Sequence, residues 1–523
     1  MPDNNLTYAD PAIPDPAANG SLNAVRTENT QNTTGMENPD PMAGTVQSTR
    51  ISRTDDDVRA PRTPGRTEAA AENSFPTAPA PGNAAPTAPA TESAAPPAAD
   101  TSAGNPAGAT SAGNTSAGNL KISVVSSIGL IPVENATITI SYTGDPTPLE
   151  VLTTDSSGQT SVTELPAPPL ELSLQPENEQ QPYSEYNIEV TADGYEPVLV
   201  SGSEIFAGEL SLQPIQMNPL ASTEEEEKIV IIPAHTLFGN FPPKIPEDEI
   251  KPMAETGEIV LSRVVIPEYV IVHDGVPSDP TARNYWVRYR DYIKNVASCE
   301  IYSTWPENAL YANILVIMSF TLNRVYTEWY RNQGYNFTIT SSTAYDQKWV
   351  YGRNIFENID YIVDTVFANY LSRPGVRQPI FTSYCDGKRV TCSGLSQWGS
   401  AYLAEQGYSA IEIIRYYYGN DMYINTAEVI SGVPSSWPGY DLGIGSSGEK
   451  VRQLQNQLNR IARNYPAIPT VTADGIYGPA TAQAIRTFQG IFNLPQTGVT
   501  DYPTWYEVSE IYVGVSRISE PGS

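Results

Sequence analysis

The chain has 523 residues, enough for several domains, and it carries 59 Asp and Glu against 30 Lys and Arg, a formal net charge of −29. This balance argues against nucleic acid as a partner, because neutralising phosphates requires an excess of Lys and Arg. Three cysteines exclude a scaffold stapled by many disulfides, and no apolar run is long enough to span a membrane. The acidity is uneven, since residues 281–420 hold 13 Lys and Arg against 11 Asp and Glu.

Residues 1–118 are predicted to form a disordered arm. They are rich in Pro, Ala, Thr, Asn and Gly, and this composition cannot bury enough apolar area to offset chain entropy. The sequence Thr-Ser-Ala-Gly-Asn begins at Thr101, Thr110 and Thr115, which indicates a flexible spacer. We expect the arm to provide reach rather than a specific binding site.

Residues 119–219 alternate apolar and polar side chains, as half-buried strands do. Ile138 and Ile140 alternate with threonines, and Ile188 and Val190 alternate with polar residues. A Thr-Thr-Asp-x-x-Gly turn, a Leu-Pro-Ala-Pro segment and a late Gly-Tyr follow in order. This order resembles the carboxypeptidase-regulatory-like (transthyretin-like) β-sandwich, which implies an all-β spacer or adhesive module. The segment contains neither His nor Cys, so zinc carboxypeptidase chemistry is not expected there.

Residues 220–258 are predicted to be a linker. The acidic run from Thr223 to Lys228 indicates an extended chain, because like charges repel each other. The prolines between Pro242 and Pro252 point the same way, since proline interrupts regular structure.

Residues 259–424 mix strand and helix patterns, which indicates an α+β domain. Strands are expected at 264–266 and 269–272, helices at 311–330, 355–370 and 403–418, and a hairpin that joins 381–384 to 390–391 around Asp386-Gly387.

Within residues 292–320, the acidic side chain of Glu300 has apolar neighbours in the sequence. These neighbours are Val296, Cys299, Ile301 and Trp305. Pro306 then begins a long apolar helical run at 307–325. A carboxyl group against an apolar wall has its charged form disfavoured, so it can hold a proton and act as a general acid. On these residues alone, a capping or solvated glutamate is an open alternative.

Two separated motifs decide how we interpret Glu300. The first comprises Tyr292, Ile293, Lys294, Val296, Ala297, Glu300, Trp305, Pro306, Ala309, Leu310 and Ala312. The second comprises Gly394, Leu395, Ser396, Gln397, Trp398 and Gly399, followed by Gly407 and Tyr416 to Gly419. Together they resemble the sporulation protein D (SpoIID/LytB) family of lytic transglycosylases over residues 264–419.

This resemblance implies an activity and a set of site residues. Glu300 would be the general acid that cleaves peptidoglycan glycan strands, and Trp305, Ser396, Gln397 and Trp398 would contact the substrate. The family carries Gln and Arg where this chain has Asn313 and Met318. The alternative is therefore a catalytically lapsed protein that only binds peptidoglycan.

Cys385 and Cys392 bracket the expected hairpin, and three states are open for them: zinc ligands, a small disulfide or buried thiols. Some members of the resembled family hold zinc near the second motif. This chain offers only His235 and His273 as imidazole donors, so reduced structural thiols are our default interpretation and no cofactor is expected.

Residues 441–512, which follow a linker at 425–440 and precede a tail at 513–523, repeat a helix and turn pattern. One amphipathic helix is expected at 451–461, Pro479 opens a second, and Thr504-Trp505 starts a short third helix. The pattern consists of Gly448, Val451, Leu454, Gln455, Leu458, Asp474 to Pro479, Thr481, Phe488, Gln489, Thr504 and Trp505. It closely resembles the three-helix peptidoglycan-binding-like domain. Thr497-Gly498 departs from the Asp-Gly that the family usually has there. Most of these positions are expected to pack the core, and Asp474, Tyr477 and Thr481 are expected to be exposed loop residues that contact glycan.

The sequence thus predicts a multidomain, wall-associated protein: a disordered arm, an all-β sandwich, an α+β SpoIID-like domain and an all-α three-helix domain. Peptidoglycan is the expected partner, and the cell wall or the spore envelope is the expected location. The first residues lack a basic region followed by an apolar one, so no secretory signal is recognised.

Overall fold

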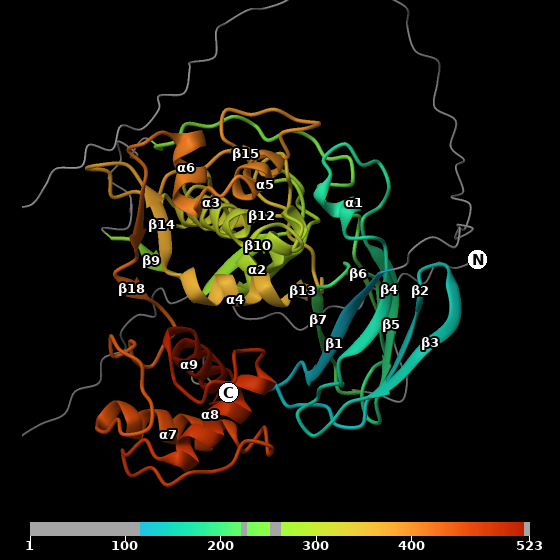
Figure 1. Cartoon of the computed structure of the whole chain (residues 1–523), viewed down its shortest axis with the longest axis vertical. Helices are drawn as coiled ribbons and strands as arrows, with labels where there is room; N and C mark the ends of the chain where they lie inside the picture. The colour runs from blue at the N-terminus through green and yellow to red at the C-terminus, as the bar shows by residue number, and fades with distance from the viewer. Residues whose placement is uncertain (1–115, 221–226, 252–262, 517–523) are drawn as a thin grey trace, which may run out of the picture. The chain divides into compact units, whose positions relative to one another are not determined.

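The computed structural model describes residues 116–220, 227–251 and 263–516, which form several domains with β-sheets and a helical C-terminal region (Figure 1). The predicted arm lies almost entirely outside the described residues, as does the acidic run at 223–226. The third Thr-Ser-Ala-Gly-Asn copy is an exception. Most of it belongs to strand β1 (Ser116–Ser126), so the spacer prediction is wrong at this copy.

Two sheets make up the β-domain, residues 116–231. In the first, the order is β13 (Ile355–Phe356), β7 (Leu210–Met217), β1 and β4 (Thr163–Ala167). The second has β3 (Asp145–Thr153), β2 (Thr137–Tyr142), β5 (Ser184–Thr191), β6 (Val198–Ile205) and β8 (Lys228–Ile231). Helix α1 (Glu171–Leu174) follows β4. The buried side chains of both sheets share one hydrophobic core that includes Leu120, Ile138, Leu165 and Ile188.

Register explains one exposed aromatic residue in this domain. The predicted alternation would bury Tyr142, but the pairing of β2 with β3 shifts between Ile140 and Tyr142. A bulge moves the following side chain to the other face of a sheet. Tyr142 is therefore exposed, while Ile138 and Ile140 are buried as expected.

The α+β domain, residues 232–430, is built around helix α3 (Glu307–Tyr326), whose side chains are nearly all buried. The other helices are α2 (Tyr289–Glu300), α4 (Glu357–Val366), α5 (Gln397–Glu405), α6 (Ala410–Tyr418) and the 3-10 turn Arg331–Gln333. One sheet has the order β11 (Asn284–Arg288), β10 (Tyr269–His273) and β12 (Ile339–Thr340). Three separate strand pairs complete the domain: β14 (Asn369–Ser372) with β17 (Tyr423–Thr426), β15 (Tyr384–Cys385) with β16 (Leu395–Ser396), and β9 (Val265–Ile266) with β18 (Val429–Ile430).

Three predicted elements of this domain differ from the structure. The helix expected at 355–370 is only α4, because Ile355 and Tyr370 lie in strands. The helix expected at 403–418 is divided into α5 and α6, since Gly407 has a φ of 86° and Ser409 starts a new helix in a capping box with Glu412. The expected hairpin is also wrong, because residues 390–391 do not form a strand and Tyr384 of β15 pairs in parallel with Leu395 of β16.

The helical C-terminal region contains α7 (Glu449–Ile461), α8 (Pro479–Ile491) and α9 (Tyr502–Ser516). Helices α7 and α8 begin where the sequence predicts, with Pro479 at the first turn of α8. The third helix was expected to be short, but it has 15 residues.

Candidate functional site

Glu300 is the last residue of α2. The helix ends there because Ile301 turns to an extended backbone while its N–H still donates to the carbonyl of Ala297. The chain then reaches Pro306, which precedes α3. This break directs the Glu300 side chain toward the second motif, and only 4% of the residue is exposed.

Every polar partner of the Glu300 carboxylate is a donor or a cation. Its Oε1 accepts from the backbone N–H of Lys348 at 2.9 Å and from the Tyr384 hydroxyl at 3.3 Å. Its Oε2 accepts from the Gln397 amide at 3.3 Å, and the same amide donates to the Glu300 carbonyl at 3.0 Å. The Lys244 ammonium lies 4.0 Å from Oε1. These contacts fix the orientation of the carboxylate in a buried site.

The second motif places Gln397 at this carboxylate by local rules. Ser396 is the N-cap of α5 and accepts from the Gly399 N–H at 2.9 Å, so Gln397 begins the helix. Gly394, directly before β16, allows the chain to pass close to Ser383, because a Cβ at Gly394 would lie 1.6 Å from the Ser383 carbonyl oxygen. The small residues of this motif thus serve packing, and Gln397 contacts the Glu300 carboxylate.

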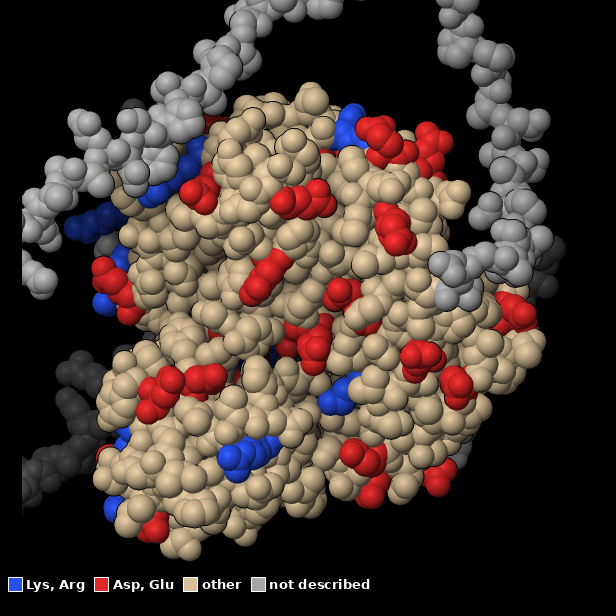
Figure 2. Space-filling model, viewed as in Figure 1, with Lys and Arg blue, Asp and Glu red and all other residues tan. Residues whose placement is uncertain are grey.

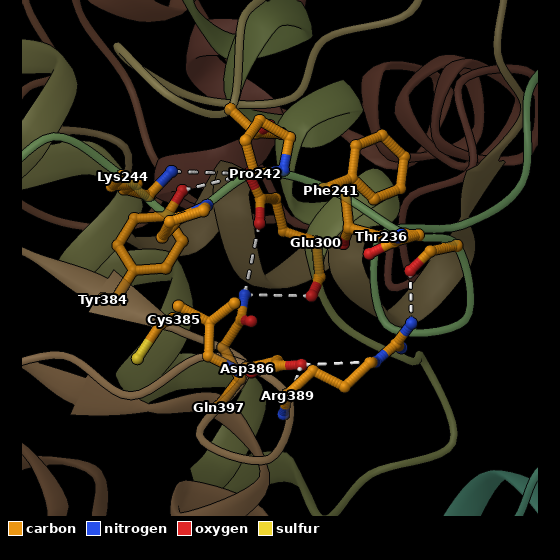
Figure 3. Close-up of a pocket in the computed structure, with 15 residues that line it drawn as sticks. Thr236, Phe241, Pro242, Lys244, Glu300, Tyr384, Cys385, Asp386, Arg389 and Gln397 are labelled. Carbon is orange, nitrogen blue, oxygen red and sulfur yellow. Dashed lines mark hydrogen bonds and ion pairs between the residues drawn. The ribbon is translucent and has the colours of Figure 1, made fainter. Parts of the chain in front are cut away.

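A pocket of about 70 Å³ opens next to Glu300 (Figure 3). Its walls come from residues 236–244, from β15 with the loop that follows it, and from the start of α5, together with Glu300 of α2 and Thr343. Lys244, Tyr384 and Gln397 surround the carboxylate, as Figure 3 shows. Pockets for small molecules usually measure about 300–1,000 Å³. In this structure the pocket is therefore smaller than a sugar unit requires.

Residues 236–251, which we call the strap, were expected to belong to a linker, but they are packed on the α+β domain. The Arg389 guanidinium donates to the carbonyls of Leu237, Phe238 and Gly239. At the other end, the Arg324 guanidinium binds both carboxylate oxygens of Glu247 at 2.8 and 2.6 Å. The prolines indicated a linker, but they do not prevent packing here, because partners on the domain bind the strap.

Burial dominates the electrostatics of the pocket. It lowers the pKa of the Lys244 ammonium, and the nearby Glu300 charge opposes this shift. It also raises the pKa of the Tyr384 hydroxyl well above its ordinary value, with the Glu300 charge as the next cause. Tyr384 therefore remains a neutral hydrogen-bond donor.

The residues expected to contact substrate divide into two groups. Gln397 lines the pocket, whereas Trp305, Ser396 and Trp398 do not. Trp305 is 3% exposed and its indole N–H donates to the Ser173 carbonyl at 3.1 Å, so it is buried away from the pocket where substrate contact was expected. Its ring lies 5.0 Å from that of Trp398, which is half-buried.

Cys385 and Cys392 are joined in a disulfide, so the default interpretation as reduced thiols is wrong. In this state neither sulfur is a thiolate that could bind zinc. Within the described residues, no group of three or more His, Cys, Asp and Glu side chains is arranged to hold a metal ion. The remaining cysteine, Cys299, is buried, and burial raises the pKa of its thiol to about 11.

The two positions at which the chain differs from the resembled motif lie in the core. Asn313 is buried and donates to the Ser400 hydroxyl at 2.7 Å, which ties α3 to α5. Met318 is fully buried in the hydrophobic core and does not line the pocket. The residues that sequence reasoning missed are Lys244, Asp386 and Arg389. The sequence feature that could have indicated a site role for Lys244 is its position, with Phe241, among the strap prolines.

In the C-terminal region, the expected glycan contacts are mostly buried. Tyr477 is 0% exposed and donates to the Gly498 carbonyl at 3.0 Å, and Thr481 is 2% exposed. The expectation of exposure is therefore wrong for both. Asp474 is exposed as predicted, and its carboxylate accepts from the Ile476 N–H at 2.8 Å.

Two buried glutamines hold two similar turns in this region. Gln455 of α7 accepts from the Gly475 N–H at 2.8 Å and donates to the Ile476 carbonyl at 3.0 Å. Gln489 of α8 accepts from the Gly498 N–H at 2.9 Å and donates to the Val499 carbonyl at 2.9 Å. Both glycines have positive φ, 78° and 72°. A repeated helix and turn unit thus organises the region.

Comparison with known proteins identifies this region. Residues 447–507 match the model of a putative peptidoglycan binding domain. This part of the chain is a peptidoglycan-binding domain. A curated relative, the zinc D-Ala-D-Ala carboxypeptidase of Streptomyces albus G, is 36% identical over 77 residues, which cover 14% of this chain and 28% of that protein.

Similarities to solved structures are weak and carry no argument about function. The minor pilin GBS52 of Streptococcus agalactiae is 16% identical, with 21% of this chain and 48% of that chain covered at a TM-score of 0.15. The Bacillus anthracis TIE protein is 18% identical, with 20% and 17% covered at a TM-score of 0.14.

A peptidoglycan-binding domain fits peptidoglycan as a partner and an association with the cell wall. In the part of the chain that the structure describes, no helix has both the length and the apolar character to cross a bilayer. Figure 2 shows Asp and Glu scattered over the visible face of the molecule, with Lys and Arg at fewer places.

Proposed function

We propose that the protein is a modular cell-wall protein whose α+β domain is a SpoIID-like lytic transglycosylase. In this proposal the arm gives reach, the β-domain is a carboxypeptidase-regulatory-like spacer, and the C-terminal domain binds peptidoglycan. The observation that supports it most is the contact between the two quoted motifs. Gln397 of the second motif bonds to the carboxylate of Glu300 in the first, 97 residues away in sequence.

The proposed reaction needs one carboxyl group. Protonated Glu300 gives its proton to the glycosidic oxygen after N-acetylmuramic acid, and the bond from that oxygen to the anomeric carbon breaks. The 6-hydroxyl of the same sugar then attacks the anomeric carbon to close a 1,6-anhydro ring, and its proton returns to the Glu300 carboxylate. Two-carboxylate glycosidases differ, because there a second carboxylate activates water or attacks the sugar.

A second candidate function is a non-catalytic peptidoglycan binder of the cell wall or spore envelope. The small pocket favours it, since about 70 Å³ next to Glu300 does not hold a sugar ring without movement of the walls. The ring of donors around the carboxylate also fits a purely structural glutamate.

The substitution Glu300→Gln separates the two functions. It preserves shape and removes the proton donor, and a general acid contributes about 10²- to 10⁴-fold to the rate. The full-length protein and the variant would be incubated with glycan strands stripped of stem peptides, and products analysed by mass spectrometry. We expect 1,6-anhydro ends from the unmodified protein and almost none from Glu300→Gln.

Pelleting with peptidoglycan is the control, and both proteins should bind equally because the C-terminal domain is unchanged. Hydrolytic reducing ends instead of anhydro ends would refute the proposed mechanism. No product from the unmodified protein, with binding intact, would favour the binder.

A further inference from the structure

The strap is fixed at both ends and presents one cation between them. At its start, the Thr236 hydroxyl donates to the Cys299 carbonyl at 2.7 Å, beside Glu300. At its end, Glu249 binds the Arg373 guanidinium at 2.6 and 2.8 Å. Prolines 242, 243 and 246 restrict the backbone in the middle. A side chain on this middle part therefore has a defined position.

Lys244 is that side chain. Its ammonium donates to the Asp346 carbonyl, lies 4.4 Å from the ring centre of Tyr384 and is 4.0 Å from Glu300 Oε1. Only 11% of the side chain is exposed. A buried cation on an aromatic face is held by that face as well as by its anion. Desolvation opposes its charge, and Glu300 and Asp346 favour it.

The other cations near the pocket are engaged differently. Lys348 reaches Glu300 through its backbone N–H, while its ammonium lies 5.4 Å from the ring centre of Phe241. The Arg389 guanidinium donates to the strap carbonyls, and its Nε lies 3.5 Å from Asp386 Oδ2. Among the described residues, Lys244 is the cation that forms an ion pair with Glu300.

We propose that Lys244, contributed by the strap, is a positioning residue for Glu300 that stabilises the carboxylate formed when the proton passes to the glycosidic oxygen. This inference rests on the proposed lytic function. An ammonium 4.0 Å from Oε1 attracts the negative carboxylate left by the transfer more strongly than it attracts the neutral acid. The ammonium thus favours proton release in the step that breaks the glycosidic bond, and the strap is part of the site.

Three variants of the full chain test this role. Lys244→Met removes the charge and keeps an apolar stem, and Lys244→Arg keeps the charge. Lys251→Met is the matched control, because Lys251 is also a buried strap lysine, with its ammonium 2.7 Å from Glu247, but it does not line the Glu300 pocket. It loosens the strap without changing the charge at Glu300.

The first readout is the rate of anhydro-end formation at varied glycan concentration. We expect Lys244→Met to lower kcat by at least about tenfold with KM little changed, Lys244→Arg to recover most of the loss, and Lys251→Met to stay within about threefold. Equal losses in Lys244→Met and Lys251→Met would overturn the proposal, because strap packing would then explain both.

The second readout does not require activity. Thermal unfolding of Lys244→Met, Glu300→Gln and the double variant forms a cycle, and interacting side chains give non-additive shifts in Tm. We expect non-additivity for Lys244 with Glu300 and additivity for Lys251 with Glu300. If the unmodified protein is inactive, the lytic function fails, and additive shifts in the first cycle would then also overturn the pairing of Lys244 with Glu300.

Discussion

The Glu300 pocket and the C-terminal domain are built in opposite ways. The pocket gathers side chains from α2, the strap, β15 and α5, so its partners are as far apart in sequence as Lys244 and Gln397. The C-terminal domain uses one local unit twice, in which a buried glutamine clamps a glycine turn. A short unit can be recognised from sequence, as the match of residues 447–507 shows. A site made of distant segments depends on the fold of the whole domain.

We expect the largest effect from a substitution that removes long-range contacts next to the pocket. Arg324 is fully buried and binds Asp346 at 2.7 Å as well as Glu247 of the strap. Arg324→Met leaves the buried Asp346 without its cation and leaves Glu247 paired with Lys251 alone, so we expect the α+β domain to lose about 3–5 kcal/mol of unfolding free energy. Urea titration with hydrogen exchange on strap peptides measures this. Arg331→Met is the control, since that side chain is 53% exposed, and an equal loss there would refute the argument.

An intermediate effect is expected from the two glutamine clamps. Gln455→Ala and Gln489→Ala each leave a buried glycine N–H without its acceptor, which costs about 1–3 kcal/mol. We expect the two losses to be similar and confined to residues 447–507, as measured by hydrogen exchange during urea unfolding. Gln483→Ala, at an exposed position of α8, should change little. A loss at only one clamp would show that the two units are not equivalent.

The smallest expected effect concerns the turn that departs from the family. The Thr497 hydroxyl accepts from the Val499 N–H at 3.1 Å, just as the Asp474 carboxylate accepts from the Ile476 N–H. Thr497→Asp should therefore preserve the turn and change stability by no more than about 0.5 kcal/mol. Thermal unfolding of the full chain checks this. A loss above about 1 kcal/mol would mean that the hydroxyl has a role that a carboxylate does not replace.

Periodicity predicted the elements that local sequence dictates. The alternation around Ile138 and Ile188 identified buried strand residues, and Pro306 and Pro479 marked where two helices begin. Periodicity gave wrong predictions where contact with a neighbouring element determines which strands pair or which side chains are buried. The bulge at Tyr142 depends on pairing with β3, and Tyr384 of β15 pairs in parallel with Leu395 of β16 instead of with the segment expected at 390–391.

The sequence alone was enough to select Glu300, the two motifs and the peptidoglycan-binding domain, because each consists of residues that lie close together in the chain. Tertiary structure alone decided that Gln397 meets Glu300, that Trp305 and Tyr477 are buried, and that a segment rich in proline and acid forms one wall of the pocket. The physical reason is that burial and charge pairing depend on which surfaces meet. Lys244 lies beside Glu300 on a strap that is bound by Arg324, Arg373 and Arg389, and these partners are distant from it in sequence.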